Sequence, residues 1–255
     1  GGSKTPRREF TGRAAALGMS TAFAGTIGGA AGVFSETAKA AMTPKKGGHL
    51  RLGMAQGNTT DSLDPALMLA EFTNMTNHNI KSLLADVDHK GVLMPELAES
   101  WEASGSPSTW IYNLRKGINF HDGKSFGADD VIGTIHYHNG ENSKSSLKTI
   151  AKTIKEMKAD GQHRVIFTLE EPNAHFPFLL SAFPISSIRD GTIYDFANGT
   201  GAYVLKEFEP GIRLIVERDP NKWEDHVGHF DSVEVTPLID TAYLLKLLME
   251  AVTNL

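Results

Sequence analysis

A histidine and an aspartate stand side by side at His121 and Asp122, inside the stretch INFHDGKSFGADDV. An imidazole beside a carboxylate is a pairing that enzymes use for general acid–base chemistry, so a periplasmic hydrolase that uses these two residues is one hypothesis. The alternative is a turn, because Gly123 follows directly and glycine accepts positive φ without a steric penalty. A general base also needs a positioned nucleophile or metal ion, and neighbouring side chains more often point apart. The sequence therefore favours a turn.

The residues on either side of this pair predict a strand and a helix. Trp110, Tyr112 and Leu114 alternate with polar residues, which is typical of a half-buried strand. After the pair, GADDVIGTIHYH predicts a helix with Asp129 and Asp130 in its first turn, where the positive end of the helix dipole stabilises acids. The pair thus falls in the connection between a strand end and a helix start.

Similar patterns recur along the rest of the chain. Alternating apolar residues predict strands in HLRLGMA, HRVIFTLEE and IRLIVERD, and helical spacing extends from Met75 to Leu84. A further helix is expected in SSLKTIAKTIKEMKAD, with an apolar stripe made by Leu147, Ile150, Ala151, Ile154 and Met157. Strands interleaved with helices predict an α/β or α+β fold with more than one sheet.

The composition argues against several classes of function. The chain of 255 residues has a net charge of −5 and no basic block, so no nucleic-acid partner is expected. Cysteine is absent, which removes disulfides, thiolate catalysis and cysteine-ligated metal sites. His136 and His138 stand two apart, which places them on different faces of a helix, whereas helical metal ligands prefer spacings of three or four. We therefore expect no metal ion or other cofactor.

The first forty residues predict an export signal. A basic start is followed by a weakly apolar run over residues 14–34, and Ala38 and Ala40 are the small residues that a signal peptidase needs. The run is long enough to span a bilayer, so a membrane-tethered interaction module is an alternative. Its many Gly, Ala, Ser and Thr residues contribute little transfer energy, which favours a cleaved signal. We expect cleavage near Ala40 and a periplasmic mature protein.

Two adjacent arginines indicate the export route. Arg7, Arg8 and Phe10 resemble the twin-arginine signal, although Pro6 and Thr11 depart from the usual serine before the pair and leucine after the phenylalanine. The low hydrophobicity of the following run agrees with that route. The Tat translocase is therefore an expected partner, and its substrates fold before export.

Four longer stretches follow one another through most of the chain after residue 45. They are DSLDPA (61–66), PELAESWEAS (95–104), TWIYNLRKGINFHDGKSFGADDV (109–131) and GTGAYVLKEFEPGIRLIVERDPNKW (199–223). In this order they resemble the solute-binding proteins of peptide-type ABC importers, known as family 5. In that family the HDG segment is a structural turn, which agrees with the interpretation from the residues alone.

Gly127 departs from the family pattern. The family usually has Ser or Thr at this position, three residues before Asp130, and that pair would form a capping box. Glycine supplies no side-chain acceptor, so we expect the helix start to be weaker by a few tenths of a kcal/mol.

The resemblance implies an α/β fold of the type II periplasmic-binding-protein kind, in which ligand binds in a cleft between two lobes. Residues 48–66 and 184–255 correspond to an incomplete first lobe, and residues 67–183 to the extra domain of peptide binders. The second lobe has no counterpart in the sequence. We therefore expect weak or no ligand binding by this polypeptide alone, because small-molecule sites gain affinity by enclosing most of the ligand.

The resemblance also implies the site and the partners. Family positions that face the ligand map onto Leu69, Glu71, Ala182 and Phe183, with ordinary core packing as the alternative for the three apolar residues. Glu71 would suit a cationic solute, with an ordinary surface acid as the favoured alternative. The expected partners are a small, peptide-like solute and an ABC permease, and no catalytic residue is implied. Binders of oligopeptides, dipeptides, sugars, opines, nickel and haem share these motifs, so the solute itself stays open.

Overall fold

The structure, a computed structural model, describes residues 45–238. The signal segment predicted for residues 1–40 lies outside the described residues. The helices are η2 (Pro65–Leu67, a 3₁₀ turn), α3 (Glu71–Ile80), α4 (Ala128–Asn139), α5 (Lys148–Ala151) and α6 (Phe176–Leu180). The strands are β1 (His49–Ala55), β2 (Ala85–Val87), β3 (Leu93–Pro95), β4 (Ala98–Ala103), β5 (Thr109–Leu114), β6 (Ile154–Ala159), β7 (Arg164–Leu169), β8 (Ile188–Arg189), β9 (Thr192–Ile193), β10 (Tyr203–Glu209), β11 (Arg213–Arg218) and β12 (Ser232–Leu238).

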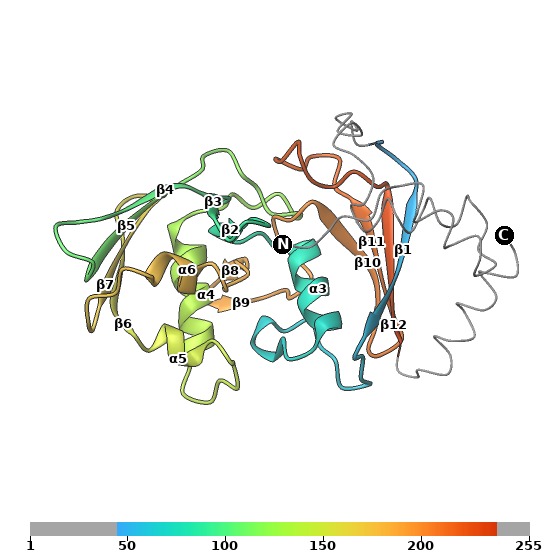
Figure 1. The fold of residues 1–255 in the computed structure, drawn as a ribbon, viewed down its shortest axis with the longest axis horizontal. Coiled ribbons are helices and arrows are strands. Elements are labelled where there is room, and N and C mark those ends of the chain that lie inside the picture. Colours follow the sequence, from blue (N-terminus) through green and yellow to red (C-terminus); the bar gives the residue numbers. More distant parts are fainter. Residues whose placement is uncertain (1–44, 239–255) are drawn as a thin grey trace, which may run out of the picture. The chain divides into compact units, whose positions relative to one another are not determined.

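One four-stranded sheet joins the beginning and the end of the described chain. Its order is β1–β12–β11–β10, with β1 parallel to β12 and the other pairs antiparallel (Figure 1). Helix α3 packs against this sheet on β1 and β10. Apolar residues that alternate along β11 and β12 are buried in the core between the sheet and the helix. This core contains Phe72, Ile80, Tyr203, Leu214, Val216, Val233 and Val235.

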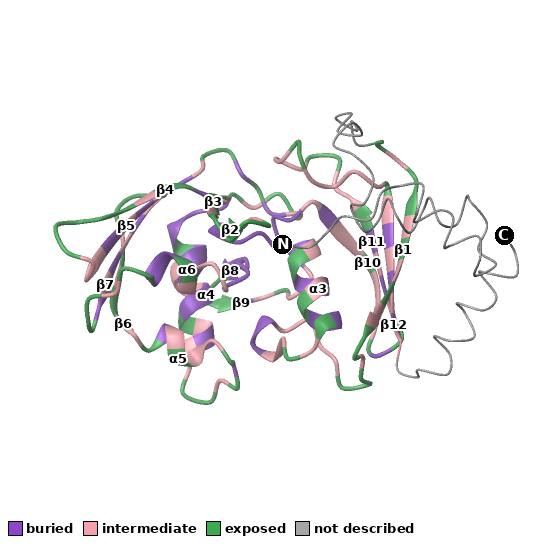
Figure 2. Ribbon diagram, viewed as in Figure 1, coloured by how far each residue is buried: buried purple, intermediate pink, exposed green. Residues whose placement is uncertain are grey.

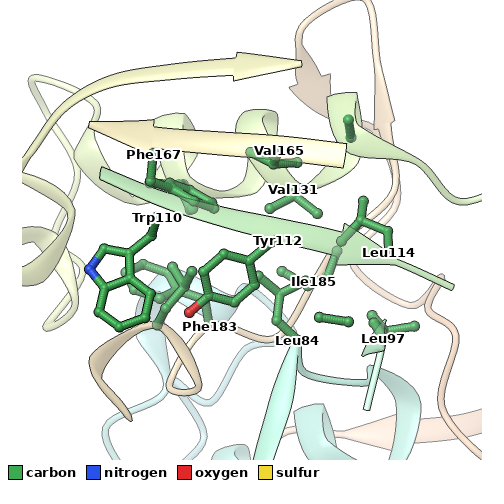
Figure 3. Close-up of a cluster of buried hydrophobic side chains, with 14 of the residues drawn as sticks. Leu84, Leu97, Trp110, Tyr112, Leu114, Val131, Val165, Phe167, Phe183 and Ile185 are labelled. Atoms are coloured by element: carbon green, nitrogen blue, oxygen red, sulfur yellow. The ribbon is translucent and has the colours of Figure 1, made fainter. Parts of the chain in front are cut away.

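A second four-stranded sheet forms the larger core. Its order is β4–β5–β7–β6, all antiparallel, and α4 packs against β6 and β7. Residues of β5 and β7 alternate between buried and half-buried, as the sequence predicts (Figure 2). Figure 3 shows part of this cluster, in which Tyr112 and Phe167 meet edge to face with ring centroids 5.3 Å apart.

Helix α4 begins where the sequence predicts, and its start is partly capped. Gly127 is the N-cap residue, and its N–H donates to Oδ2 of Asp130 at 3.0 Å. The other Asp130 oxygen accepts from the Ile188 N–H at 2.9 Å and from Lys124. Burial raises the pKa of Asp130 against the opposing effect of these donors. Glycine thus leaves out one half of the capping box, while Asp130 supplies the other.

The prediction of a helix across residues 145–160 is wrong beyond its first turn. Helix α5 ends at Ala151, and strand β6 begins at Ile154. A register shift between Ile154 and Glu156 places Met157 opposite Phe167 and turns it to the same side as Ile154. This bulge produces an apolar spacing of three within a strand, which a helical pattern also has.

The helix expected over Met75–Leu84 exists with different bounds. Helix α3 begins at Glu71 and ends at Ile80, and Lys81 is extended. Leu84 instead packs in the larger core. The domain boundaries suggested by the resemblance stay a prediction, although α3 shares its core with the β1–β12–β11–β10 sheet.

The end of α3 lies in direct backbone contact with a glycine pair. The Gly201 N–H donates to the Ile80 carbonyl at 2.8 Å. A Cβ atom at Gly201 would lie 2.6 Å from the Asn79 oxygen, and one at Gly199 would lie 2.1 Å from the Ile80 oxygen. Only glycine fits at these two positions without a backbone shift.

Replacement of Gly201 by alanine tests this contact. We expect Gly201→Ala to lower the free energy of unfolding by roughly 3 kcal/mol, because the clashing atoms belong to the backbone and cannot rotate away. Urea unfolding measures the change. Gly105→Ala is the control, since a Cβ atom there would meet nothing within 4 Å and only the φ of 78° would strain an alanine; it should lose roughly 1 kcal/mol. An equal loss in the free energy of unfolding in the two variants would contradict the packing argument.

Candidate functional site

His121 and Asp122 serve different contacts in the structure. The backbone N–H of His121 donates to the Gly199 carbonyl at 2.9 Å, and its Nε2 bonds the Gly201 carbonyl at 2.9 Å. Burial lowers the pKa of His121 and favours the neutral ring. The Asp122 carboxylate accepts instead from Tyr194 and from the Lys124 N–H. Burial alone would raise the pKa of Asp122, but these hydrogen bonds outweigh it and lower the value.

The turn itself is as the sequence predicts. Gly123 has φ of 86°, and its N–H donates to the Phe120 carbonyl at 2.8 Å. Among the described residues, the His121 and Asp122 side chains share no hydrogen bond. The histidine links the turn to the Gly199 and Gly201 backbone through these two hydrogen bonds.

The loop before α3 is tied to the end of α4. Asp64 caps η2, since its Oδ1 accepts from the Ala66 N–H at 2.8 Å and Pro65 fits the first helical position. Its Oδ2 accepts a hydrogen bond from the Tyr137 hydroxyl at 3.0 Å. Burial and the Asp64 carboxylate raise the pKa of Tyr137 to about 12, so the phenol remains a donor.

An aromatic row continues from Tyr137 to the residues after α6. The Tyr137 ring lies 6.0 Å from Phe196, and the neighbouring His138 ring meets Phe183 edge to face at 5.1 Å. His138 is fully buried, and its Nδ1 lies 2.6 Å from the Ser145 hydroxyl. Burial lowers the pKa of His138 to about 4, so the ring is neutral at pH 7.

A shallow hollow of about 440 Å³ opens beside this row. The residues that line it are Asp64, Ala66, Leu67, Tyr137, Gly140, Asn142, Ser143 and Lys144. It presents a carboxylate, an ammonium group, a phenol and amide or hydroxyl groups. Such a surface can hold a polar solute through hydrogen bonds and charge, and it contains no nucleophile paired with a base.

The predicted ligand residues fall into two groups. Leu69 is 73% exposed and Glu71 is an exposed first residue of α3, so both are free to meet a solute. Ala182 is half-buried, and Phe183 is fully buried against His138. The row from Phe183 through His138 and Tyr137 reaches the loop that carries Leu69. Their role in ligand binding stays a prediction.

The histidines of HYHN face different sides of α4, as predicted. His136 is exposed, whereas His138 is buried. Within residues 45–238, no group of three or more His, Asp or Glu side chains is arranged to hold a metal ion. Within the same range, no helix is long and apolar enough to cross a membrane.

Two ionisable residues, the buried Lys81 and the half-buried Glu96, have no signal in the sequence. Lys81 is 1% exposed, and its ammonium group donates to Oδ1 of Asn77 at 2.8 Å and to the Phe196 carbonyl at 2.7 Å. Burial lowers the pKa of Lys81 to about 7. Burial and the Glu224 charge raise the pKa of Glu96 to about 8. A lysine at the end of a helix and a glutamate beside a strand are ordinary surface patterns. Only the tertiary structure shows how far each side chain is removed from solvent.

The architecture matches the type II periplasmic-binding-protein fold, which defines the class. The oligopeptide-binding protein AppA from Bacillus subtilis, in complex with a nonapeptide, has a TM-score of 0.73 at 21% identity over 82% of this chain and 44% of that one. The binding protein DppA from Helicobacter pylori, in complex with the peptide STSA, has a TM-score of 0.69 at 21% identity over 82% of this chain and 46% of that one.

The sequence comparison gives the family. Residues 92–251 match the bacterial extracellular solute-binding proteins, family 5, in the middle region of that family. The chain belongs to this family.

The curated relatives are longer than this chain. The oligopeptide-binding protein AppA of Bacillus subtilis is 25% identical over 74% of this chain and 37% of its own length. The probable periplasmic-binding protein SapA of Escherichia coli is 30% identical over 55% of this chain and 31% of its own length. The chain thus spans less than two fifths of the length of these relatives.

The buried histidine of the aromatic row predicts a pH effect on stability. Because the folded pKa of His138 lies below the unfolded value, the unfolded chain binds more protons as pH falls from about 6.5 to about 4. Stability should therefore fall across that window. In His138→Gln this part of the fall, on the order of 1 to 3 kcal/mol, should disappear.

Urea unfolding at several pH values between 7 and 4 measures the slope. The matched control is His136→Gln, which removes an exposed histidine from the same helix and should leave the slope as in the wild type. A slope that survives unchanged in His138→Gln would contradict the assignment.

Proposed function

We propose that the chain is the non-catalytic, solute-binding part of an extracytoplasmic ABC-importer component for peptide-like solutes. The observation that carries this proposal is the family match over residues 92–251. Two structural relatives hold peptides, a nonapeptide in AppA and STSA in DppA. Another, NikZ of Campylobacter jejuni, holds a nickel–histidine complex with a TM-score of 0.70. A peptide is therefore the first solute to test, and the metal complex the second.

The solute would lie against the loop before α3. Leu69 offers an exposed apolar contact, and Glu71 places a carboxylate beside it. Ala182 and Phe183 would support the site from the far end of the aromatic row, with Phe183 acting through its packing rather than by direct contact. A second lobe would complete the enclosure in proteins of the relatives' full length, and a permease would receive the loaded form.

The contacts of the one candidate pair argue against a hydrolase. Nε2 of the His121 ring bonds the Gly201 carbonyl and the backbone N–H bonds the Gly199 carbonyl, while Nδ1 is buried; the Asp122 carboxylate accepts from Tyr194 and the Lys124 N–H. Neither residue lines the hollow beside Tyr137. The hydrolase hypothesis therefore lacks a substrate-facing base.

Solute binding can be measured on the native protein isolated from its source cells. Isothermal titration with a tetrapeptide, a nonapeptide and nickel–histidine should show one-to-one binding for at least one peptide. Glu71→Gln should raise the Kd by roughly tenfold for peptides that place a free amine or a lysine near residue 71. The reason is that one lost charge-assisted contact is worth about 1.5 kcal/mol.

Glu99→Gln provides the matched control, because Glu99 is an exposed acid on β4. It should bind as the wild type does. His121→Ala and Asp122→Asn should leave solute binding intact. Peptide turnover that is lost in these two variants would overturn the proposal in favour of the hydrolase.

Export through the twin-arginine route can be tested at the arginine pair. Changing both Arg7 and Arg8 to lysine should retain the protein in the cytoplasm, because the twin-arginine signal depends on the pair. Cell fractionation and N-terminal sequencing measure the outcome, with a mature start expected near Ala41. A protein that resists carbonate extraction from membranes with residues 14–34 intact would instead support the membrane-tethered module.

A further inference from the structure

A second cavity, of about 590 Å³, lies where four segments meet. Its walls come from the C-terminal end of α3 with the residues after it, the β2–β3 hairpin, residues 201–203 at the start of β10 and the loop between β11 and β12. Four carboxylates line it, namely Asp86, Asp88, Glu96 and Glu224. The solute site described above does not include this cavity, and the inference drawn from it is independent of the solute.

Contacts of Trp223 hold the loop of residues 219–231 in place. The indole N–H of Trp223 donates to the Thr200 carbonyl at 3.1 Å. The guanidinium of Arg115 lies 5.4 Å from the centre of the Trp223 ring, and its Nε donates to the Glu96 carbonyl at 2.5 Å. Arg115 thus links the strand end at Glu96 to the loop, and Glu224 follows Trp223 directly into the same cavity.

Neither Glu96 nor Glu224 has a salt-bridge partner among the described residues that line this cavity. Among the ion pairs within residues 45–238, none includes Glu96 or Glu224. The buried ammonium group of Lys81 lies in the same wall but is committed to Asn77 and Phe196. Glu96 and Glu224 are both half-buried, and like charges that share a cavity repel, so one carboxyl retains its proton to a higher pH.

Neighbours on every wall act on these two groups. The charged or titratable residues around them are His78 of α3, Lys81 just after it, Asp86 and Asp88 of the hairpin, Arg115 after β5, Tyr203 of β10, and Lys222 and His226 of the loop. Burial and then Glu224 raise the pKa of Glu96, against hydrogen bonds from Leu83 and Ser82. Burial also raises the pKa of Glu224, against His226, Arg115 and Lys222. In both residues burial is the largest influence, and the pKa is raised on balance.

We propose that this cavity is a proton-operated latch that fixes the 219–231 loop when at least one of Glu96 and Glu224 is protonated and loosens it when both are ionised. The loop joins two cores, because Trp223 packs against the larger one and Phe230 against the β1–β12–β11–β10 sheet. Loosening it would weaken the link between them.

The direction of the pH effect follows from proton linkage. The closed loop binds more protons than the open loop between pH values of about 4.5 and 8, because the pKa of Glu96 is raised only when the cavity is closed. The closed form is therefore most stable at acid pH and loses stability as pH rises through this window.

Hydrogen exchange of the full chain, followed by mass spectrometry from pH 5.5 to pH 9, tests the latch. After correction for the intrinsic chemical rate, protection of residues 219–231 should fall by roughly tenfold or more across this range, since each unit of pKa shift in the closed form is a factor of ten. In Glu96→Gln and in the Glu96→Gln, Glu224→Gln double variant, protection should become independent of pH.

Glu99→Gln, an exposed acid on β4, should behave as the wild type. Amides of β5 and β7 report global unfolding and should keep their protection throughout. Loop protection that is constant with pH in the wild type would sink the proposal. A fall that persists in the double variant, or one that β5 and β7 share equally, would overturn it as well.

Discussion

The contact between the end of α3 and the Gly199–Gly201 backbone is the constraint on which the other contacts depend. It brings two main chains within hydrogen-bond distance, and only glycine leaves room for that approach. The carbonyls around it then become shared acceptors: Gly201 for the His121 ring, and Thr200 for Ser82 and Trp223. Three segments that are distant in sequence therefore meet on one short stretch of backbone.

This constraint explains why a histidine beside an aspartate is structural here. A ring nitrogen that bonds a buried carbonyl provides that acceptor with a hydrogen-bond partner. A buried carbonyl without a partner would cost free energy in an apolar setting. The same logic applies to Lys81, which follows the last residue of α3 and donates from its ammonium group to the Phe196 carbonyl. Both residues have chemistry that looks catalytic in a linear sequence, yet each donates to or bonds a backbone carbonyl at a crowded junction.

Local patterns predicted the elements that depend on local physics. Alternation located β5 and β7, and the acids of its first turn located the start of α4. The prediction failed at residues 152–160, because the bulge that sets the spacing of Ile154 and Met157 is defined by pairing with β7. No signal within the segment records that partner.

The candidate site was predictable to a similar extent. Leu69 in the loop before α3 and Glu71 at the start of α3 are exposed, whereas Phe183 is fully buried against His138, which the sequence alone does not connect to it. Such residues meet only through the tertiary fold, so composition and spacing do not reveal them.

The parallel pairing of β1 with β12 has a consequence for the order of folding. His49 lies opposite Ser232, so the first strand to leave the ribosome waits for one of the last in the described range. The antiparallel sheet between them is built from nearby segments and closes shorter loops, which favours its earlier formation. Until β12 is made, β1 presents an unpaired edge that invites association with other chains. Synthesis through Leu238 therefore sets the earliest moment at which this sheet is complete, and any route that exports folded protein must wait for it.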